Sequence, residues 1–391
     1  MNLTPLQLNY SDLSAPDIFR LHQEYSKGYD IKPRPTATGD LRRIGIIGGD
    51  FRRHSCMMLL LPILRNTSLN TTIYMTGSEH DHVTETVKSL ASFHDVSDMD
   101  ARKRAGLIRS HGVQCLIDLS GYTGGNALDV LAEGAAPMQV TYMGYPNTLG
   151  GSLADFRIVD HITDLPSADD YHSERLARMP GCFLTFEPPA IDAPIVERDW
   201  REPPVFGCFA NFCKLNTGVV DAWSEILHGV PDALLFLKSS RLYTSDPAGY
   251  MRQQFATRGI DPARLIFETA TGDQAKHLND YNRVDVQLDT FPYNGTATTC
   301  EALWMGVPPV TLSGRDHRSR VSRSLLTACD HTELCTVDVN DYIQTAMAVV
   351  KLARRFYRPT LRGDLLRSEL CNHAQFTRQF DEMLHTLWRQ L

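Results

Sequence analysis

The chain has 391 residues, of which 22% are charged and 42% are hydrophobic, and its formal net charge is −7. At about 150 residues per domain, this length suggests two or three domains, each able to bury an ordinary core. The acidic balance argues against a nucleic-acid-binding protein, which normally carries a basic excess, so we expect no nucleic-acid partner.

Three sequence features bear on location. The longest apolar run, Met57–Leu64, is far shorter than the roughly 20 residues that span a bilayer. The N-terminus lacks the charged and apolar regions of a signal peptide. The nine cysteines include no C-x-x-C pair and fit buried, reduced thiols better than a zinc site. We therefore expect a cytoplasmic protein with no membrane span and no structural metal.

Residues 1–40 predict a helical appendage followed by a linker. Ser14 is placed to cap a helix whose apolar face runs from Ile18 to Tyr25. The proline-rich segment 32–36 then reads as a linker to the next domain.

Residues 41–200 alternate between short apolar strands and amphipathic helices, which predicts an open parallel sheet. Strands are expected at 43–49, 71–75, 113–119, 140–143 and 156–160. Ligands on such sheets bind beyond the carboxyl ends of the strands. Loops rich in glycine and polar residues fall at that edge, at 48–54, 120–125 and 144–150.

A connection dense in proline, residues 180–204, precedes a second round of the same alternation. Strands are expected at 205–210, 233–238, 264–267, 284–288 and 310–312, and long helices at 338–355 and 374–390 close the chain. The pattern predicts an α/β protein with two Rossmann-like, doubly wound domains, 41–200 and 201–391, facing each other across a cleft.

The stretch Asp289–Gly306 is the most informative in the chain and reads D-T-F-P-Y-N-G-T-A-T-T-C-E-A-L-W-M-G. A strand, an Asn294-Gly295 turn, a run of small residues and a helix start follow one another. Free backbone N–H groups and the positive end of a helix suit a phosphate, and Glu301 lies where an acidic side chain could reach a ribose diol. The alternative is an ordinary strand-to-helix turn with a threonine cap.

Further candidates for chemistry are isolated polar residues in the loops. Lys214 follows a strand and could neutralise a diphosphate, and Asn211 beside it could bind a base or a phosphate. His54 could act as a general base or orient an acceptor, with Asp50 orienting it in turn. His277 could stack on a nucleotide base. For each, the alternative is a solvated residue, a cap or a turn.

Two charged clusters have weaker functional interpretations. Glu79-His80-Asp81-His82 looks like a metal site, but no second set of ligands is spaced to complete it. The basic run from Arg315 to Arg323 suits either a charged helix face or a wall of the cleft.

Six segments of the chain, taken in order, resemble the catalytic region of the O-GlcNAc transferase and SPINDLY group, glycosyltransferase family 41, and especially its bacterial members. The segments are R-I-G-I-I-G-G-D-F-R-R-H, D-L-S-G-Y-T-G-G-N, A-P-M-Q-V-T-Y-M-G-Y-P-N-T, S-E-R-L-A-R-M-P, G-C-F-A-N-F-C-K-L-N and D-T-F-P-Y-N-G-T-A-T-T-C-E-A-L-W-M-G-V-P.

The resemblance implies a GT-B fold and a metal-independent, inverting transfer of a sugar from a nucleotide donor, UDP-GlcNAc above all, to Ser or Thr of a protein. It implies His54 and Lys214 as catalytic residues. The donor-binding residues that it implies are Asn211, His277, Asn294, Gly295, Thr296, Ala297, Thr298, Thr299 and Glu301. The residues that it implies around the sugar and acceptor are Asp50, Tyr122, Gly144, Tyr145 and Pro146.

Several positions depart from the family's pattern. Thr296-Ala297-Thr298 replaces a His-Thr-Thr run of the animal enzymes, and Glu301 replaces their aspartate. Gly124 replaces a lysine of the animal enzymes, and Tyr122 a histidine common in bacteria. Because SPINDLY uses GDP-fucose, transfer of fucose or glucose, to oxygen or to Asn, stays open.

Two alternatives of another class remain. One is a nucleotide-sugar epimerase or hydrolase, and the other is a non-catalytic nucleotide-sugar-binding partner. The tetratricopeptide repeats of most relatives are absent from this sequence, so we expect the acceptor protein to be chosen by the cleft rim, the N-terminal helix or a separate targeting partner.

Overall fold

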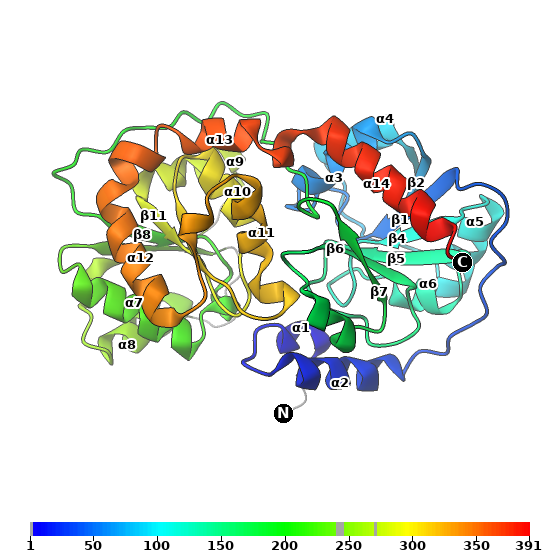
Figure 1. Cartoon of the computed structure of the whole chain (residues 1–391), viewed down its shortest axis with the longest axis horizontal. Helices are drawn as coiled ribbons and strands as arrows, with labels where there is room; N and C mark the ends of the chain where they lie inside the picture. Colours follow the sequence, from blue (N-terminus) through cyan, green and yellow to red (C-terminus); the bar gives the residue numbers. More distant parts are fainter. Residues whose placement is uncertain (1–2, 240–245, 270–271) are drawn as a thin grey trace. The chain divides into compact units, whose positions relative to one another are not determined.

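The computed structural model describes residues 3–239, 246–269 and 272–391. The chain forms two compact units: unit 1 comprises Met1–Glu187 together with Glu369–Leu391, and unit 2 comprises Pro188–Ser368. Each unit contains one parallel sheet with helices packed around it (Figure 1). The two Rossmann-like domains expected from the sequence are therefore present, but the division differs from the expected 41–200 and 201–391.

Unit 1 contains a seven-stranded sheet in the order β3-β2-β1-β4-β5-β6-β7. Every neighbouring pair in this sheet is parallel. Its strands are β1 (Arg43–Gly48), β2 (Asn70–Met75), β3 (Ser92–Asp95), β4 (Cys115–Asp118), β5 (Met138–Tyr142), β6 (Phe156–Asp160) and β7 (Arg175–Met179). The central strands β4, β5 and β6 are buried along their whole length, as a parallel sheet covered on both faces requires.

The helices of unit 1 are α1 (Pro5–Leu8), α2 (Ala15–Ser26), α3 (Met57–Asn66), α4 (His82–Leu90), α5 (Ala101–Ser110), α6 (Leu128–Ala132) and α14 (His373–Trp388). The Ser14 hydroxyl accepts from the backbone N–H of Asp17 at 3.3 Å, which confirms the expected N-cap of α2. The buried side chains of α2 are Ile18 and His22, whereas Tyr25 is exposed.

The last helix belongs to unit 1 because it packs on α3 and β7 and is tied there by hydrogen bonds. The Asp381 carboxylate accepts from the Thr67 hydroxyl and from the backbone N–H of Ser68, both at 2.8 Å. The Trp388 indole N–H donates to the Gly39 carbonyl at 2.8 Å. The sequence pattern identified this helix but not the unit it completes.

Unit 2 contains a six-stranded sheet in the order β10-β9-β8-β11-β12-β13. Its paired strands are all parallel. They are β8 (Val205–Cys208), β9 (Leu234–Ser239), β10 (Leu265–Thr269), β11 (Val286–Leu288), β12 (Pro309–Leu312) and β13 (Cys335–Thr336). The chain crosses from β10 at one edge back to β11 in the middle, beside β8, so the strand order reverses there. Ligands of open α/β sheets bind at such a reversal.

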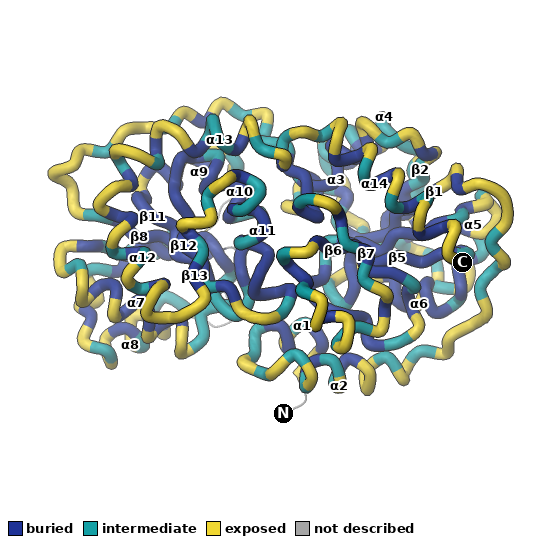
Figure 2. The backbone as a smooth tube through the Cα atoms, viewed as in Figure 1, coloured by how far each residue is buried: buried dark blue, intermediate teal, exposed yellow. Residues whose placement is uncertain are grey.

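The helices of unit 2 are α7 (Thr217–Gly229), α8 (Pro247–Ala256), α9 (Gln274–Asn279), α10 (Ala297–Trp304), α11 (Val321–Ala328), α12 (Val339–Leu352) and α13 (Leu361–Arg367). The sheet and the inner faces of these helices form the buried part of the unit (Figure 2). A core cluster beneath α9 and α10 includes Phe209, Tyr281 and Ala302.

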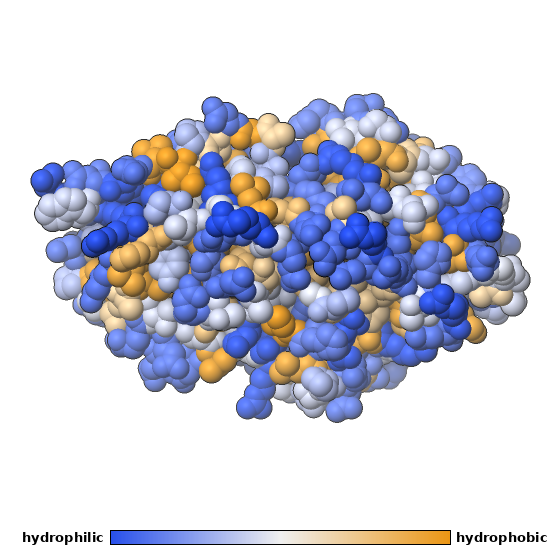
Figure 3. Space-filling view, turned by 45° about the horizontal axis from the view of Figure 1, so that its top comes forward, coloured by the Kyte–Doolittle hydropathy of each residue, from blue (hydrophilic) through white to orange (hydrophobic). Residues whose placement is uncertain are grey.

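Hydrophobic residues on the face shown in Figure 3 form separate patches among hydrophilic ones. Isolated apolar residues of this kind are normal on protein surfaces. Across the part of the chain that the structure describes, no helix combines the length and apolar character that a membrane crossing needs.

Candidate functional site

The loop after β11 is fixed by a buried carboxylate. Asp289 is 3% exposed, and its Oδ1 accepts from the backbone N–H groups of Thr290 at 2.9 Å and Gly295 at 2.7 Å. Its Oδ2 accepts from the Thr311 hydroxyl of β12 at 2.8 Å. Burial raises the pKa of this carboxyl group, and the hydrogen bonds act in the opposite direction. The loop is therefore held in one shape before any ligand arrives.

The small residues that follow leave the N-terminus of α10 open. Thr296 is the N-cap and makes no capping hydrogen bond with its side chain. Within the described chain, the backbone N–H groups of Ala297 and Thr298 donate to no acceptor, and both residues are partly exposed. Such N–H groups and the helix dipole attract an anion. The alternative interpretation, an ordinary threonine cap, is therefore wrong.

The neighbouring residues of this loop are structural. Thr299 is buried, and its hydroxyl bonds to that of Ser322 at 2.9 Å. Asn294 is 1% exposed and donates through Nδ2 to the Thr290 carbonyl at 2.9 Å. Two of the predicted donor-binding side chains, Asn294 and Thr299, therefore support the loop from within.

Lys214 lies at the end of the short 3₁₀ turn after β8, and its ammonium group is held beside the loop. Nζ donates to the Asn294 carbonyl at 2.7 Å and lies 3.7 Å from the centroid of the Tyr293 ring. Burial lowers the pKa of Lys214, while the nearby Asp289 acts in the opposite direction. The structure thus brings Lys214 to the same loop as the N-terminus of α10, as predicted for a diphosphate site. Asn211 begins this turn, and its carbonyl accepts from the Lys214 backbone N–H at 2.9 Å.

His277 and Glu301, predicted from separate segments, are in direct contact. His277 Nε2 lies 3.1 Å from Glu301 Oε2, and the same oxygen accepts from the Tyr281 hydroxyl at 3.1 Å. The carboxylate is largely buried, and its other oxygen, Oε1, has no hydrogen-bond partner in the described chain. Glu301 is therefore oriented through one oxygen while the other stays available to a ligand.

The middle of the basic run after β12 is buried, whereas Arg315 at its start is exposed. Arg318 and Arg320 are 3% and 9% exposed. The Arg318 carbonyl accepts from the Asn294 backbone N–H at 2.8 Å, and Arg320 donates to the Gly314 carbonyl at 2.9 Å. This segment supports the loop after β11 from the side of β12.

In unit 1, His54 lies in the loop between β1 and α3 and is partly exposed. Its Nδ1 accepts from the backbone N–H of Cys56 at 3.3 Å. In the neutral ring the proton is then on Nε2, which lies 3.9 Å from Asp50 Oδ2. Asp50 and His54 are therefore close together, as predicted, and the contact at Nδ1 favours the tautomer with its proton on Nε2.

The loop after β4 begins at another buried carboxylate, Asp118, which accepts from the N–H groups of Ser120 at 3.1 Å and Gly121 at 2.9 Å. The Tyr122 hydroxyl donates to the Leu149 carbonyl at 2.8 Å, which links this loop to the one after β5. Two loops predicted to border the sugar and the acceptor therefore touch each other.

The Gly144–Pro146 segment is packed tightly against other parts of unit 1. A Cβ atom on Gly144 would lie 1.6 Å from the Leu119 carbonyl oxygen, so only glycine fits. Tyr145 is 1% exposed and Pro146 is also buried. The Tyr145 ring is therefore directed into the protein, and a sugar beside this loop would meet its backbone.

The N-terminal helices surround the Tyr145 hydroxyl. It lies 2.6 Å from His22 Nε2, accepts from Asn9 Nδ2 at 3.0 Å and lies 2.8 Å from the Pro5 carbonyl oxygen. On the other side, the buried Arg157 of β6 donates to the Tyr145 carbonyl at 2.6 Å and to the Asn147 carbonyl at 2.7 Å. Residues 1–40 thus include an integral support of this loop.

Sequence reasoning missed His22, Arg157 and Tyr281. His22 faces inward on an amphipathic helix, and Arg157 interrupts an apolar strand, so each offered a weak signal of a buried polar contact. Tyr281 had no signal apart from its place four residues after His277.

The Glu79–His82 cluster serves local structure. Asp81 caps α4 through the N–H groups of Val83 and Thr84, and His80 pairs with Asp95 at 2.7 Å. In the described residues, no group of three or more histidine, cysteine or acidic side chains is arranged to hold a metal ion. All nine cysteines are free thiols.

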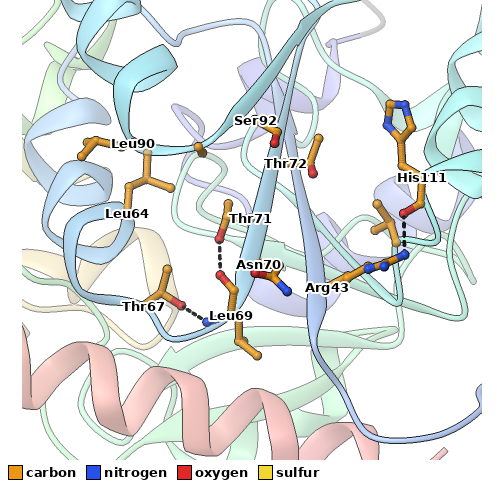
Figure 4. Close-up of a pocket in the computed structure, with 12 residues that line it drawn as sticks. Arg43, Leu64, Thr67, Leu69, Asn70, Thr71, Thr72, Leu90, Ser92 and His111 are labelled. Carbon is orange, nitrogen blue, oxygen red and sulfur yellow. Dashed lines mark hydrogen bonds between the residues drawn. The ribbon is translucent and has the colours of Figure 1, made fainter.

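A cavity of about 500 Å³ lies at the amino ends of strands β1, β2 and β3 in unit 1 (Figure 4). Arg43, Asn70 and Ser92, which line it, are the first residues of β1, β2 and β3. The predicted site lies at the carboxyl ends of the strands, so this cavity is separate from it.

Two Rossmann-like units, each built on a parallel sheet, make up the GT-B fold of glycosyltransferases, and comparison with known proteins gives the family. A model of glycosyl transferase family 41 matches residues 11–188 and 201–379. The chain belongs to this family, as its sequence motifs predicted.

Individual relatives agree with this assignment. The chain is 31% identical over 408 residues to a rice (Oryza sativa subsp. japonica) protein named probable UDP-N-acetylglucosamine–peptide N-acetylglucosaminyltransferase SPINDLY, covering 98% of this chain and 44% of that protein. The structure of a Thermobaculum terrenum O-GlcNAc transferase mutant matches with a TM-score of 0.90 and 28% identity, over 98% of this chain and 76% of that one. A Rickettsia africae glycosyltransferase, 9% identical with a TM-score of 0.54, shares the fold over 89% of this chain and 98% of its own. The chain spans less than half the length of the curated SPINDLY relative.

Proposed function

We propose that this protein transfers N-acetylglucosamine from UDP-N-acetylglucosamine to a Ser or Thr hydroxyl of another protein, with inversion at the sugar carbon and without a metal ion. The observation that carries the proposal is in unit 2. Three groups lie on or against the loop after β11 and the helix α10 that follows it: the Lys214 ammonium group, the open N-terminus of α10 and the unbonded oxygen of Glu301. These groups suit the diphosphate and the ribose of a nucleotide sugar. The names of the SPINDLY and O-GlcNAc transferase relatives support the same donor.

The chemistry required of these groups is charge neutralisation. Breaking the bond between the sugar and the diphosphate places negative charge on the leaving oxygen as an oxocarbenium-like centre develops. A fixed ammonium group and helix N–H groups stabilise that charge without having to reorganise. The hydrogen bond from Lys214 to Asn294 and its contact with Tyr293 hold the cation ready for this task.

The acceptor side is assigned to unit 1. The His54 Nδ1 accepts from the Cys56 N–H, which favours the neutral tautomer with its proton on Nε2 and supports a role in orienting the acceptor or the donor sugar rather than in removing a proton from the hydroxyl. Asp50 would fix the ring, and the backbone of Gly144–Pro146 and Tyr122 would border the sugar. A cytoplasmic location and a separate targeting partner stay predictions.

A thermal-shift panel with UDP, GDP, UDP-N-acetylglucosamine, UDP-glucose and GDP-fucose tests the donor assignment. Binding at about 100 times Kd stabilises the folded state by about 2.7 kcal/mol. We expect UDP and UDP-N-acetylglucosamine to raise the melting temperature and the others to have smaller effects. A shift by GDP compounds alone would replace the proposed donor with GDP-fucose, and no shift by any nucleotide would refute the site. Mass spectrometry of an acceptor protein incubated with the stabilising donor then tests transfer.

A further inference from the structure

We propose that Tyr281 is a positioning residue that makes the ribose contact of Glu301 selective. This inference rests on the proposed function, because it assigns a support to the donor site described above. Tyr281 touches neither the donor nor the acceptor in this scheme and acts only through the carboxylate.

The first support is the geometry of the Tyr281 hydroxyl group. The ring is fully buried, and Oη lies 3.1 Å from Glu301 Oε2 and 3.4 Å from the Thr298 carbonyl oxygen. The single hydroxyl proton has one strong acceptor here, since the charged carboxylate is closer than the neutral carbonyl. Burial and the adjacent carboxylate raise the pKa of Tyr281 well above its ordinary value, so the phenol stays protonated.

The second support is that the ring itself cannot turn away. Phe209 stacks on Tyr281 with 3.7 Å between centroids and 11° between planes. The His277 ring meets both edge-on, at centroid distances of 5.9 Å from Phe209 and 5.7 Å from Tyr281. These three aromatic rings fix the direction from which the hydroxyl donates.

The third support is how the two oxygens of Glu301 divide their roles. Oε2 contacts His277 and Tyr281, while Oε1 has no hydrogen-bond partner among the described residues. A glutamate side chain has three rotatable bonds, and holding one oxygen at two points removes most of that freedom. Oε1 is thereby aimed in one direction, where it can accept from the hydroxyls of a ribose.

The consequence is a preference for ribose over deoxyribose. A hydrogen bond to a charged group contributes about 1.5–3 kcal/mol, which corresponds to roughly 10–150-fold in affinity. Without the Tyr281 hydroxyl, His277 is the one remaining hydrogen-bond partner of the carboxylate among the described residues, and the carboxylate samples several positions. The ribose form should then lose affinity while the deoxyribose forms lose little.

The test measures Kd by calorimetry for UDP, 2′-deoxy-UDP and 3′-deoxy-UDP with the whole protein and with Tyr281→Phe. We expect the wild-type protein to prefer UDP over at least one deoxy form by about 10-fold or more, and the variant to lose most of that ratio. Glu301→Gln should lose it as well, and the double variant should lose no more than either single one, because the two residues act as a unit. Tyr74→Phe, which removes a buried tyrosine hydroxyl bonded to His111 in unit 1, is the matched control and should keep the ratio.

The outcomes separate the two proposals. Equal losses of affinity for UDP and both deoxy forms in Tyr281→Phe, or a failure of that variant to fold, would give the hydroxyl a purely structural role and overturn the inference. A wild-type protein that binds UDP without discriminating between sugars would remove Glu301 from the ribose site, and the inference with it. Absence of UDP binding in the wild-type protein would instead overturn the proposed function.

Discussion

Replacing Lys214 with alanine should reduce transfer about 100-fold or more. A unit charge roughly 4 Å from a phosphate oxygen contributes about 4 kcal/mol at an effective dielectric constant of about 20. Only the increase in this interaction energy between the bound donor and the transition state affects the rate. A loss of about 2.7 kcal/mol, the lower end for a lost transition-state donor, corresponds to about 100-fold.

The structure shows why this charge is available and what else the variant would change. Nζ is anchored 2.7 Å from the Asn294 carbonyl, so Lys214→Ala removes a loop contact as well as a cation. Asn216 provides the control, since its Nδ2 donates to the Phe291 carbonyl of the same loop at 2.7 Å and carries no charge. Asn216→Ser keeps a side chain able to cap α7 but loses that contact.

The assay is initial-rate transfer from UDP-N-acetylglucosamine to an acceptor protein, with kcat and KM determined separately. We expect Lys214→Ala to lose kcat and Asn216→Ser to keep it within a few-fold. Unchanged turnover in Lys214→Ala would refute the charge argument. Equal losses in both variants would assign the effect to the loop instead of the ammonium group.

Two further predictions concern pH and packing. Burial lowers the pKa of Lys214 below its ordinary 10.5, so kcat/KM should fall on the basic side at a lower pH than an exposed lysine would give. The bound diphosphate raises the pKa of Lys214 again, so kcat should fall at a higher pH than kcat/KM does. Lys214→Arg should remove both basic-side falls below about pH 11, because arginine stays protonated there. Profiles in which kcat and kcat/KM fall at the same pH would contradict this. Gly144→Ala places a Cβ atom 1.6 Å from the Leu119 carbonyl oxygen and should cost about 1–3 kcal/mol in urea unfolding. The control is Gly106→Ala in α5, where the added Cβ atom meets nothing within 4 Å, and this variant should be neutral or stabilising. If Gly144→Ala were as stable as this control, the loop would have shifted to accommodate the added methyl group.

Many of the strands and the form of the loop before α10 were predictable because they depend on local pattern. The expected strand at 156–160 coincides with β6, and the expected loop and helix around Thr296 and Ala297 have the predicted form. Short edge strands such as β3 and β7 were missed, since partly polar four- and five-residue runs carry little periodic signal.

Contacts between distant segments were beyond sequence reasoning. The His22–Tyr145 hydrogen bond joins residues 123 positions apart, and the contact between Tyr281 and Glu301 depends on how α9 and α10 pack. Asn294, Thr299 and Tyr145 were assigned to ligand binding by motif, yet their side chains are buried. A motif records which residues recur, and it does not separate those that touch a ligand from those that hold the loop.

The anchoring of α14 through Asp381 has a consequence for how the protein forms during synthesis. Unit 2 is one continuous segment, Pro188–Ser368, whereas unit 1 needs Glu369–Leu391 to complete it. A ribosome therefore releases all of unit 2 before unit 1 can close over Thr67 and Ser68. The sheet of unit 1 is synthesised first, but its α3 face stays uncovered until α14 has been made. We therefore expect unit 2 to complete its folding before unit 1, whereas N-terminal domains usually fold before those that follow.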